Sequence, residues 1–99
     1  MKRKHNPAER EIEWDEDKNR ASKKSHRVSF EEAATVFSDP FELTIDDPDH
    51  SHSEYRFITV GESSEGRLLV VSYAERGGKI RLISARKPTQ RERRDYEEG

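Results

Sequence analysis

Six basic side chains follow one another along the last third of the chain and could together bind a phosphate backbone. They are Arg67, Arg76, Lys79, Arg81, Arg86 and Lys87. The planar guanidinium group of arginine donates two parallel hydrogen bonds to a phosphate, and a single-stranded nucleic acid also binds to an aromatic platform. Tyr73 is the predicted platform. The alternative is a set of ordinary solvated arginines at the edge of a sheet.

Two further positions offer proton transfer near neutral pH. His26 stands at the end of a predicted helix, where an imidazole acts in acid–base chemistry or simply interacts with helix carbonyls. Glu54 follows an acidic stretch that also holds His50 and His52, and either His50 or Glu54 could act as a general acid or base. These groups could also bind a divalent cation. They lack a helical metal-binding spacing, so we predict a solvated loop and no metal site.

The net charge of −2 hides an uneven distribution along the chain. Residues 1–30 carry nine basic and six acidic side chains, residues 31–65 carry one and ten, and residues 66–99 carry nine and five. This pattern fits an anionic ligand at one site and a basic partner at another, or solvated faces that cancel. The chain has no cysteine, which excludes disulfides and thiolate metal sites. Without an apolar run of about 20 residues or a signal peptide, we expect a cytoplasmic protein that has no membrane contact.

Capping residues and hydrophobic periodicity predict the elements that position these side chains. Asp15 starts a helix that runs to about Ser25, with a thin apolar stripe at Ala21. Ser29 and Glu32 form a capping box for a second helix, which ends at residues 39–40. Strands are predicted at residues 11–14, 41–45, 55–61, 67–74 and 79–86, and residues 89 and 92 open a final helix. We therefore expect an α+β fold, with two N-terminal helices and a C-terminal helix on a twisted, mainly antiparallel sheet. Residues 11–99 form its single domain, and residues 1–10 are predicted to be a disordered basic extension.

Strict alternation along the last predicted strand separates its cations onto two faces. One face takes Ile80, Leu82, Ser84 and Arg86, and the other takes Arg81, Ile83, Ala85 and Lys87. One of these mixed faces must meet the helices. The other offers a strip of cations beside Tyr73 on the neighbouring strand.

From about Ile12 to Gly99 the chain resembles the BrnT family, the ribonuclease toxins of bacterial type II toxin–antitoxin pairs. The matching segments, in order, are Trp14-Asp15 with Lys18, Val28-Ser29-Phe30-Glu31-Glu32-Ala33, Val36-Phe37, Asp39-Pro40, Asp49-His50, Glu54-Tyr55-Arg56, Gly61 with Ser63, Arg67-Leu68-Leu69-Val70-Val71, Glu75-Arg76-Gly77, residues 80–86, Glu92-Arg93 and Tyr96-Glu97-Glu98. One departure stands out. The family usually has Lys-His-Gly before Val-Ser-Phe, whereas this chain has Ser25-His26-Arg27, with Lys24 nearby. A helix C′ position often needs a positive φ, which costs arginine about 1 kcal/mol.

The resemblance implies a RelE-like fold and RNA cleavage that inhibits translation without a metal or other cofactor. It also implies neutralisation by a BrnA-like antitoxin with a ribbon-helix-helix part, and contact with operator DNA only through the toxin–antitoxin complex. On the matching positions, our chemical inference assigns catalysis to His26, Glu54, Arg67, Arg76, Arg81 and Arg86, and RNA binding to Lys24, Tyr73, Lys79 and Lys87. The alternative function is a non-catalytic module that binds nucleic acid or protein.

Overall fold

The computed structural model describes residues 11–47 and 54–99, which form an α+β fold. Its helices are α1 (Glu16–His26), α2 (Phe30–Ala34) with a 3-10 continuation η2 (Thr35–Ser38), and α3 (Gln90–Glu98). Its strands are β1 (Ile12–Glu13), β2 (Leu43–Asp46), β3 (Tyr55–Glu62), β4 (Leu68–Arg76) and β5 (Lys79–Arg86). The predicted basic extension at residues 1–10 lies outside the described residues, as do His50 and His52.

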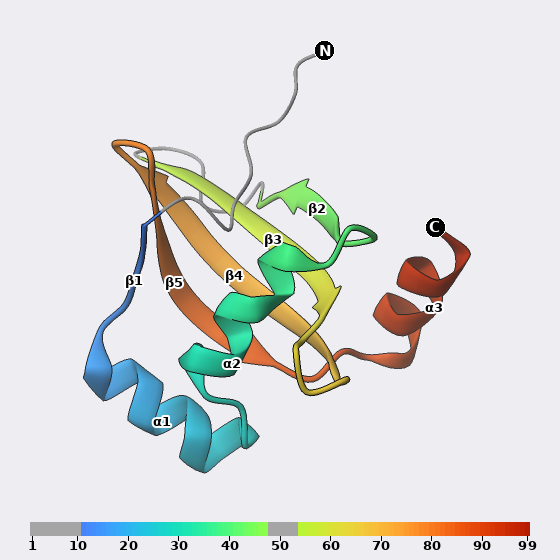
Figure 1. Cartoon of the computed structure of the whole chain (residues 1–99), viewed down its shortest axis with the longest axis horizontal. Helices are drawn as coiled ribbons and strands as arrows, with labels where there is room; N and C mark the ends of the chain where they lie inside the picture. The colour runs from blue at the N-terminus through green and yellow to red at the C-terminus, as the bar shows by residue number, and fades with distance from the viewer. Residues whose placement is uncertain (1–10, 48–53) are drawn as a thin grey trace.

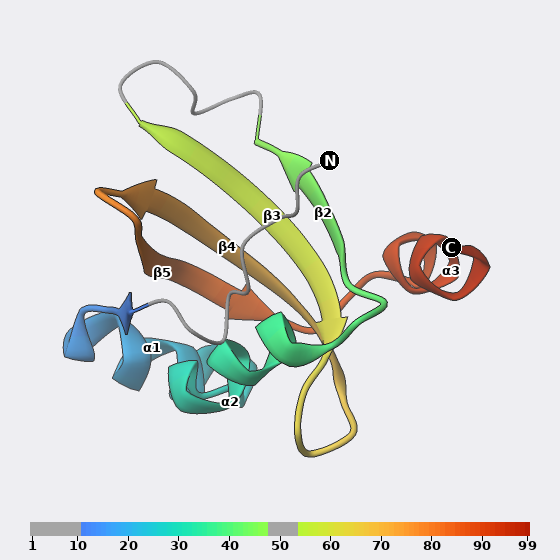
Figure 2. The same cartoon turned by 45° about the horizontal axis from the view of Figure 1, so that its top comes forward.

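The five strands form one sheet in the order β1-β5-β4-β3-β2. All neighbours are antiparallel except β1, which pairs in parallel with the start of β5. Helices α1 and α2 pack against one face of this sheet, whereas α3 lies beside the end of β3 (Figures 1 and 2). The predicted α+β arrangement on a mainly antiparallel sheet is confirmed.

Side-chain caps fix the start of each helix. Asp15 accepts a hydrogen bond from the amide of Asp17 at 2.7 Å, and Ser29 accepts one from the amide of Glu32 at 3.0 Å. At α3, Thr89 and Glu92 form the complete reciprocal capping box. The predicted box at α2 is only half formed, because the carboxylate of Glu32 contacts other side chains, described below.

The core lies between the sheet and the two N-terminal helices. Its buried members are Val28, Phe30, Ala33, Val36, Phe37, Leu69, Val71, Tyr73, Ile80, Leu82 and Ala85.

The predicted apolar stripe of α1 is wrong, because Ala21 is exposed and the helix buries Asn19 and Ser22. The amide side chain of Asn19 accepts a hydrogen bond from the backbone N–H of Phe30 at 2.8 Å and donates one to Glu31 at 3.0 Å. Polar contacts therefore join α1 to α2.

An irregularity in β5 corrects the predicted faces of that strand. Ser72 of β4 pairs with Ser84, whereas Tyr73 pairs with Leu82, so Ile83 is an extra residue without a pairing partner on β4. Such a bulge shifts the alternation of every residue that follows it. Ala85 consequently joins the core, and Arg86 lies on the opposite face, together with Arg81.

Candidate active site

Four of the predicted cations share the face of the sheet that α1 and α2 leave uncovered. The register pairs Arg76 with Lys79, Ala74 with Arg81, and Val70 with Arg86. These positions alternate with the core residues of β4, so their side chains point away from the helices. We call this side, defined by Arg76, Lys79, Arg81 and Arg86, the basic face.

Tyr73 does not lie on the basic face, and its predicted position there is wrong. Its side chain is 7% exposed and belongs to the core. The ring packs edge-on against Phe37, with centroids 4.9 Å apart, and stacks on Phe57 at 5.4 Å. Apolar packing on the helix side thus uses this tyrosine, and too little of its ring is exposed to stack on a nucleobase.

The predicted site residues divide between the two ends of the sheet. Arg67 and Arg76 stand just before and at the end of β4, nine residues apart. At about 3.3 Å per residue, this separates them by roughly 30 Å. These two arginines therefore cannot clamp the same phosphate, although the cations between them can follow an extended strand.

The hairpin end of the sheet is the end where residues 77–78 connect β4 to β5. Carboxylates already bind the cations there. Glu54 accepts hydrogen bonds from Arg56 at 2.8 Å and from Arg76 at 2.9 Å. The bond from Arg76, followed by that from Arg56, lowers the pKa of the Glu54 carboxyl group. A carboxylate held between two guanidinium groups is a weak proton acceptor, so the geometry does not favour the predicted role of Glu54 as a general base.

Lys79 and Arg81 also have acidic neighbours at the β1 edge. The ammonium group of Lys79 lies 3.6 Å from the carboxylate of Glu11, and Arg81 donates a long hydrogen bond of 3.4 Å to Glu13. All these side chains are partly solvated, so the pairs contribute little to stability. A polyanion can therefore displace these carboxylates and bind Lys79 and Arg81.

The opposite end of the sheet gathers His26 and five cations from three segments of the chain. We call this group, defined by Lys24, His26, Arg27, Arg67, Arg86 and Lys87, the basic end. The hydroxyl of Ser22 lies 2.7 Å from the carbonyl oxygen of Val28 and 3.3 Å from that of Ala85. This contact brings the end of α1 beside the end of β5, and Arg67 donates to the carbonyl oxygen of Arg27 at 2.9 Å.

Arg67 forms an ion pair with the nearly buried carboxylate of Glu32. The capping pattern had predicted that this carboxylate binds a backbone N–H instead. The Nε and Nη2 groups of Arg67 donate to the two oxygens of Glu32 at 3.0 and 2.5 Å, and Ser63 donates to the same carboxylate at 2.6 Å. The Glu32 side chain is only 5% exposed, against 35% for Arg67. The bond from Arg67 lowers the pKa of Glu32 despite its burial. Arg67 therefore links the start of β4 to α2.

Arg86 is bound in a similar way by α3. Its two terminal nitrogens donate to the two oxygens of Glu92 at 2.8 and 2.9 Å. These bonds lower the pKa of Glu92 to about 2. Glu92 also caps α3, so the pair fixes that helix beside β5. Arg86 stays partly exposed, and its Nε has no hydrogen-bond partner among the described residues.

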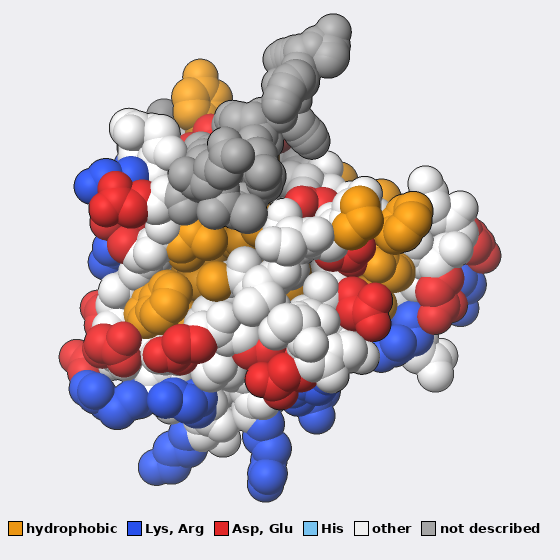
Figure 3. Space-filling model, in the orientation of Figure 1, with side chains coloured by type: hydrophobic (Ala, Val, Ile, Leu, Met, Phe, Trp, Pro, Cys, Tyr) orange, Lys and Arg blue, Asp and Glu red, His pale blue; other side chains and the backbone are white. Residues whose placement is uncertain are grey.

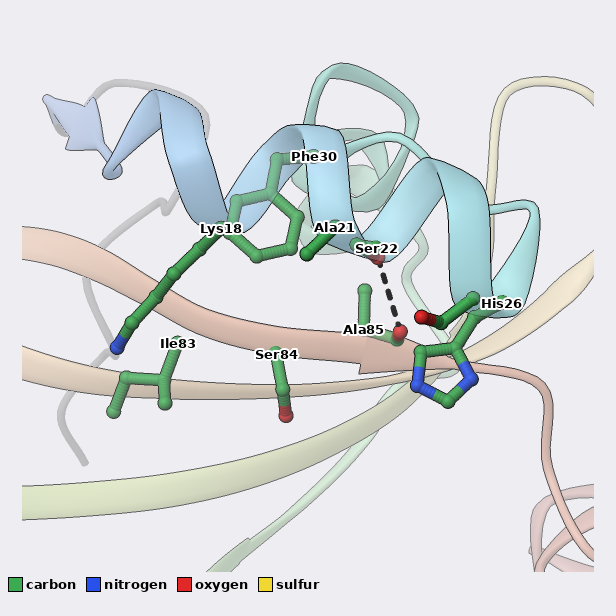
Figure 4. Close-up of a pocket in the computed structure, with 9 residues that line it drawn as sticks. Lys18, Ala21, Ser22, His26, Phe30, Ile83, Ser84 and Ala85 are labelled. Carbon is green, nitrogen blue, oxygen red and sulfur yellow. Dashed lines mark hydrogen bonds between the residues drawn. The ribbon is translucent and has the colours of Figure 1, made fainter.

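An open groove of about 280 Å³ runs between α1 and β5 and reaches the basic end. Figure 4 shows Lys18 near one end of the groove and the imidazole of His26 near the other, with the ring of Phe30 behind α1. Ser84 points away from α1 in the same view, consistent with the shifted alternation of β5. His26 is solvent-exposed, so its imidazole is accessible to a ligand.

Lys and Arg side chains form a border along the lower edge of the molecule in the view of Figure 3, over α1 and the turn that follows it. Acidic side chains lie directly above them. An exposed imidazole next to several cations can transfer a proton while the cations stabilise negative charge on a phosphate.

Sequence reasoning missed Asn19 and Ser22, although their spacing with His26, at i, i+3 and i+7, indicates a single face of α1.

No helix in the described ranges, 11–47 and 54–99, is long and apolar enough to cross a membrane. Within the same ranges, no cluster of three or more histidine, aspartate or glutamate side chains is arranged to hold a metal ion. Most of the predicted acidic loop with His50 and His52 lies outside these ranges.

Comparison with known proteins identifies the family. A family model for the ribonuclease toxin BrnT of type II toxin–antitoxin systems matches residues 14–92. The crystal structure of the Brucella abortus ribonuclease toxin BrnT has the same fold, with a TM-score of 0.59 and 21% sequence identity over 82% of this chain and 99% of that one. No curated protein matches the chain. Because the family model spans most of the sequence, this chain belongs to the BrnT family of ribonuclease toxins of type II toxin–antitoxin systems.

Proposed function

We propose that this toxin is a metal-independent endoribonuclease that cleaves mRNA at the basic end and thereby inhibits translation. The observation that carries this assignment is the exposed imidazole of His26 in the groove between α1 and the end of β5, next to the turn whose Arg27 carbonyl oxygen binds Arg67. In this mechanism the ribose 2′-hydroxyl attacks the adjacent phosphate, and the 5′-oxygen of the next nucleotide leaves. The products are a 2′,3′-cyclic phosphate and a free 5′-hydroxyl.

His26 transfers the proton in this proposal, and Glu54 does not. An imidazole ring nitrogen can accept the 2′-hydroxyl proton as a general base. Glu54 lies at the other end of β4, between Arg56 and Arg76. It serves there to orient these two arginines.

The cations act at two distances from the cleaved bond. At the basic end, Arg67 and Arg86 stabilise the charge that develops on the phosphate, using donors that their carboxylate partners leave free. Further along the basic face, Arg76 and Arg81 contact more distant phosphates of the same strand. The length of β4 supports this division, because it separates Arg67 from Arg76 by roughly 30 Å.

The antitoxin partner that the family implies is proposed to be BrnA-like, with a ribbon-helix-helix part that binds operator DNA. The support is the resemblance across residues 12–99, together with the matched family model. The toxin itself needs no cofactor in this scheme and acts in the cytoplasm, where its RNA substrate is. An antitoxin that covers the basic end would compete directly with RNA for it.

Cleavage of a labelled RNA by the refolded, antitoxin-free protein tests the proposal. We expect cleavage in EDTA, cyclic phosphate at the new 3′ ends, and a 10²–10⁴-fold lower kcat for His26→Gln, with a smaller effect for Glu54→Gln. Cleavage that requires an added divalent cation would refute the metal-independent mechanism. RNA binding without any cleavage would instead support a non-catalytic binding module.

A further inference from the structure

The turn after α1 contains a strained residue. Arg27 adopts φ 58° and ψ 34°, and it is the only residue other than glycine with a positive φ in residues 11–47 and 54–99. This left-handed conformation is costly for a residue with a Cβ atom and is the usual place for glycine at a helix end. A strained residue persists when some other interaction or function compensates for it.

No contact within the fold requires an arginine side chain at this position. The two hydrogen bonds that hold the turn use backbone atoms only. The Arg27 N–H donates to the carbonyl oxygen of Lys23 at 3.1 Å, and its own carbonyl oxygen accepts from Arg67 at 2.9 Å. Glycine would make both bonds without strain. The Arg27 side chain is exposed, and its guanidinium has no hydrogen-bond or ion-pair partner among the described residues.

This freedom distinguishes Arg27 from the two other arginines at the basic end. Arg67 donates two hydrogen bonds to Glu32, and Arg86 donates two to Glu92. A phosphate that needs two parallel donors from either of these must first displace a carboxylate. The guanidinium of Arg27 can receive a phosphate directly.

The position of Arg27 also suits a phosphate ligand. It follows His26 in the chain, and the Ser22 contacts to Val28 and Ala85 place its turn beside the end of β5. The C-terminus of a helix carries a partial negative charge that repels anions. A phosphate near His26 therefore needs a cation that extends beyond the last turn of α1, and Arg27 occupies that place.

We propose that Arg27 binds a backbone phosphate of the RNA next to the cleaved bond, through two parallel hydrogen bonds from its guanidinium group. This inference rests on the proposed function and adds a substrate-binding residue to it. The strained backbone at Arg27 is then retained because it presents the guanidinium group to the RNA. The protein loses some conformational stability and gains affinity for its substrate.

Binding of a 2′-O-methyl RNA, which has no free 2′-hydroxyl and cannot be cleaved by the proposed route, tests this inference. Arg27→Gly and Arg27→Gln both remove the charge, and we expect each to weaken binding about tenfold or more. The slope of log affinity against log salt should fall by about 0.7, the value for one phosphate contact on a single strand. Arg20→Gln removes the same charge from within α1, away from this turn, and should weaken binding less.

Thermal unfolding separates the side chain from the backbone. Arg27→Gly should raise the Tm by about 4–8 °C because it relieves the strain, whereas Arg27→Gln keeps the strain and should leave the Tm nearly unchanged. Unchanged affinity and salt slope in both variants would overturn the proposal, and so would a lower Tm for Arg27→Gly. If the wild-type protein binds RNA through Arg27 but never cleaves it, the proposed ribonuclease mechanism fails and this phosphate contact stands.

Discussion

Replacing Arg86 with alanine should abolish most of the cleavage while leaving the fold intact. Arg86 and Glu92 form a two-bond ion pair whose side chains are 42% and 28% exposed. Exposed pairs contribute about 0.2–1 kcal/mol, and Glu92 keeps its capping bonds to Thr89 in the variant. For a domain of this size, that loss lowers the Tm by roughly 4–8 °C at most.

The expected loss of activity is much larger than the loss of stability. Removal of one preorganised donor that stabilises charge in the transition state costs about 10²–10³ in kcat. Cleavage of a fluorogenic RNA measures this effect, and circular dichroism on the same samples reports whether the protein is folded. We therefore expect a native spectrum for Arg86→Ala and a rate close to background.

Glu92→Gln is the matched control. Glutamine can still cap α3, but it removes the charge that holds Arg86, so the guanidinium becomes more available to RNA. We expect a similar drop in Tm and no loss of RNA affinity. Equal losses of cleavage in the two variants, or loss of the native spectrum in Arg86→Ala, would show that Arg86 serves the scaffold and would refute its role at the phosphate.

Four further outcomes follow from the structure. His26→Gln should lower kcat with little change in KM, and an unchanged kcat at saturating RNA would remove His26 from the mechanism. Lys87→Ala, at the basic end, should slow cleavage more than Lys79→Ala at the hairpin end, as rates measured in parallel would show. Glu32→Ala leaves its arginine partner without a carboxylate, so urea unfolding should show a loss of about 2–3 kcal/mol, less than for a fully buried pair because that arginine is 35% exposed. The pKa of Glu92 lies at about 2 in the folded protein, below its ordinary value of 4.5, so its contribution to stability is present above pH 4.5 and is lost as the pH falls toward 2; the acid unfolding of Glu92→Gln should therefore depend less on pH over this interval.

The sequence alone determined the local elements of this protein. Asp15, Ser29 and Thr89 start their helices as predicted, because a capping side chain binds amides only two or three residues ahead. The strand at residues 79–86 was predicted with its observed bounds. The cost of a positive φ at Arg27 was also foreseen, because the family that the chain resembles usually has glycine at this helix C′ position. Each of these features depends on neighbours close in the chain.

The tertiary structure decided which chemical groups meet. A one-residue bulge at Ile83 moved Arg86 to the face that carries Arg81, and no local pattern marks this bulge because it depends on the pairing of β5 with β4. Packing of α2 against the sheet placed Tyr73 in the core. The length of β4 separated Arg67 from Arg76, which the sequence analysis had assigned to one site. Carboxylates far along the chain bind the guanidinium groups, as Glu32 binds Arg67. Side-chain type is local, whereas distance and pairing between side chains depend on long-range contacts that only the folded chain specifies.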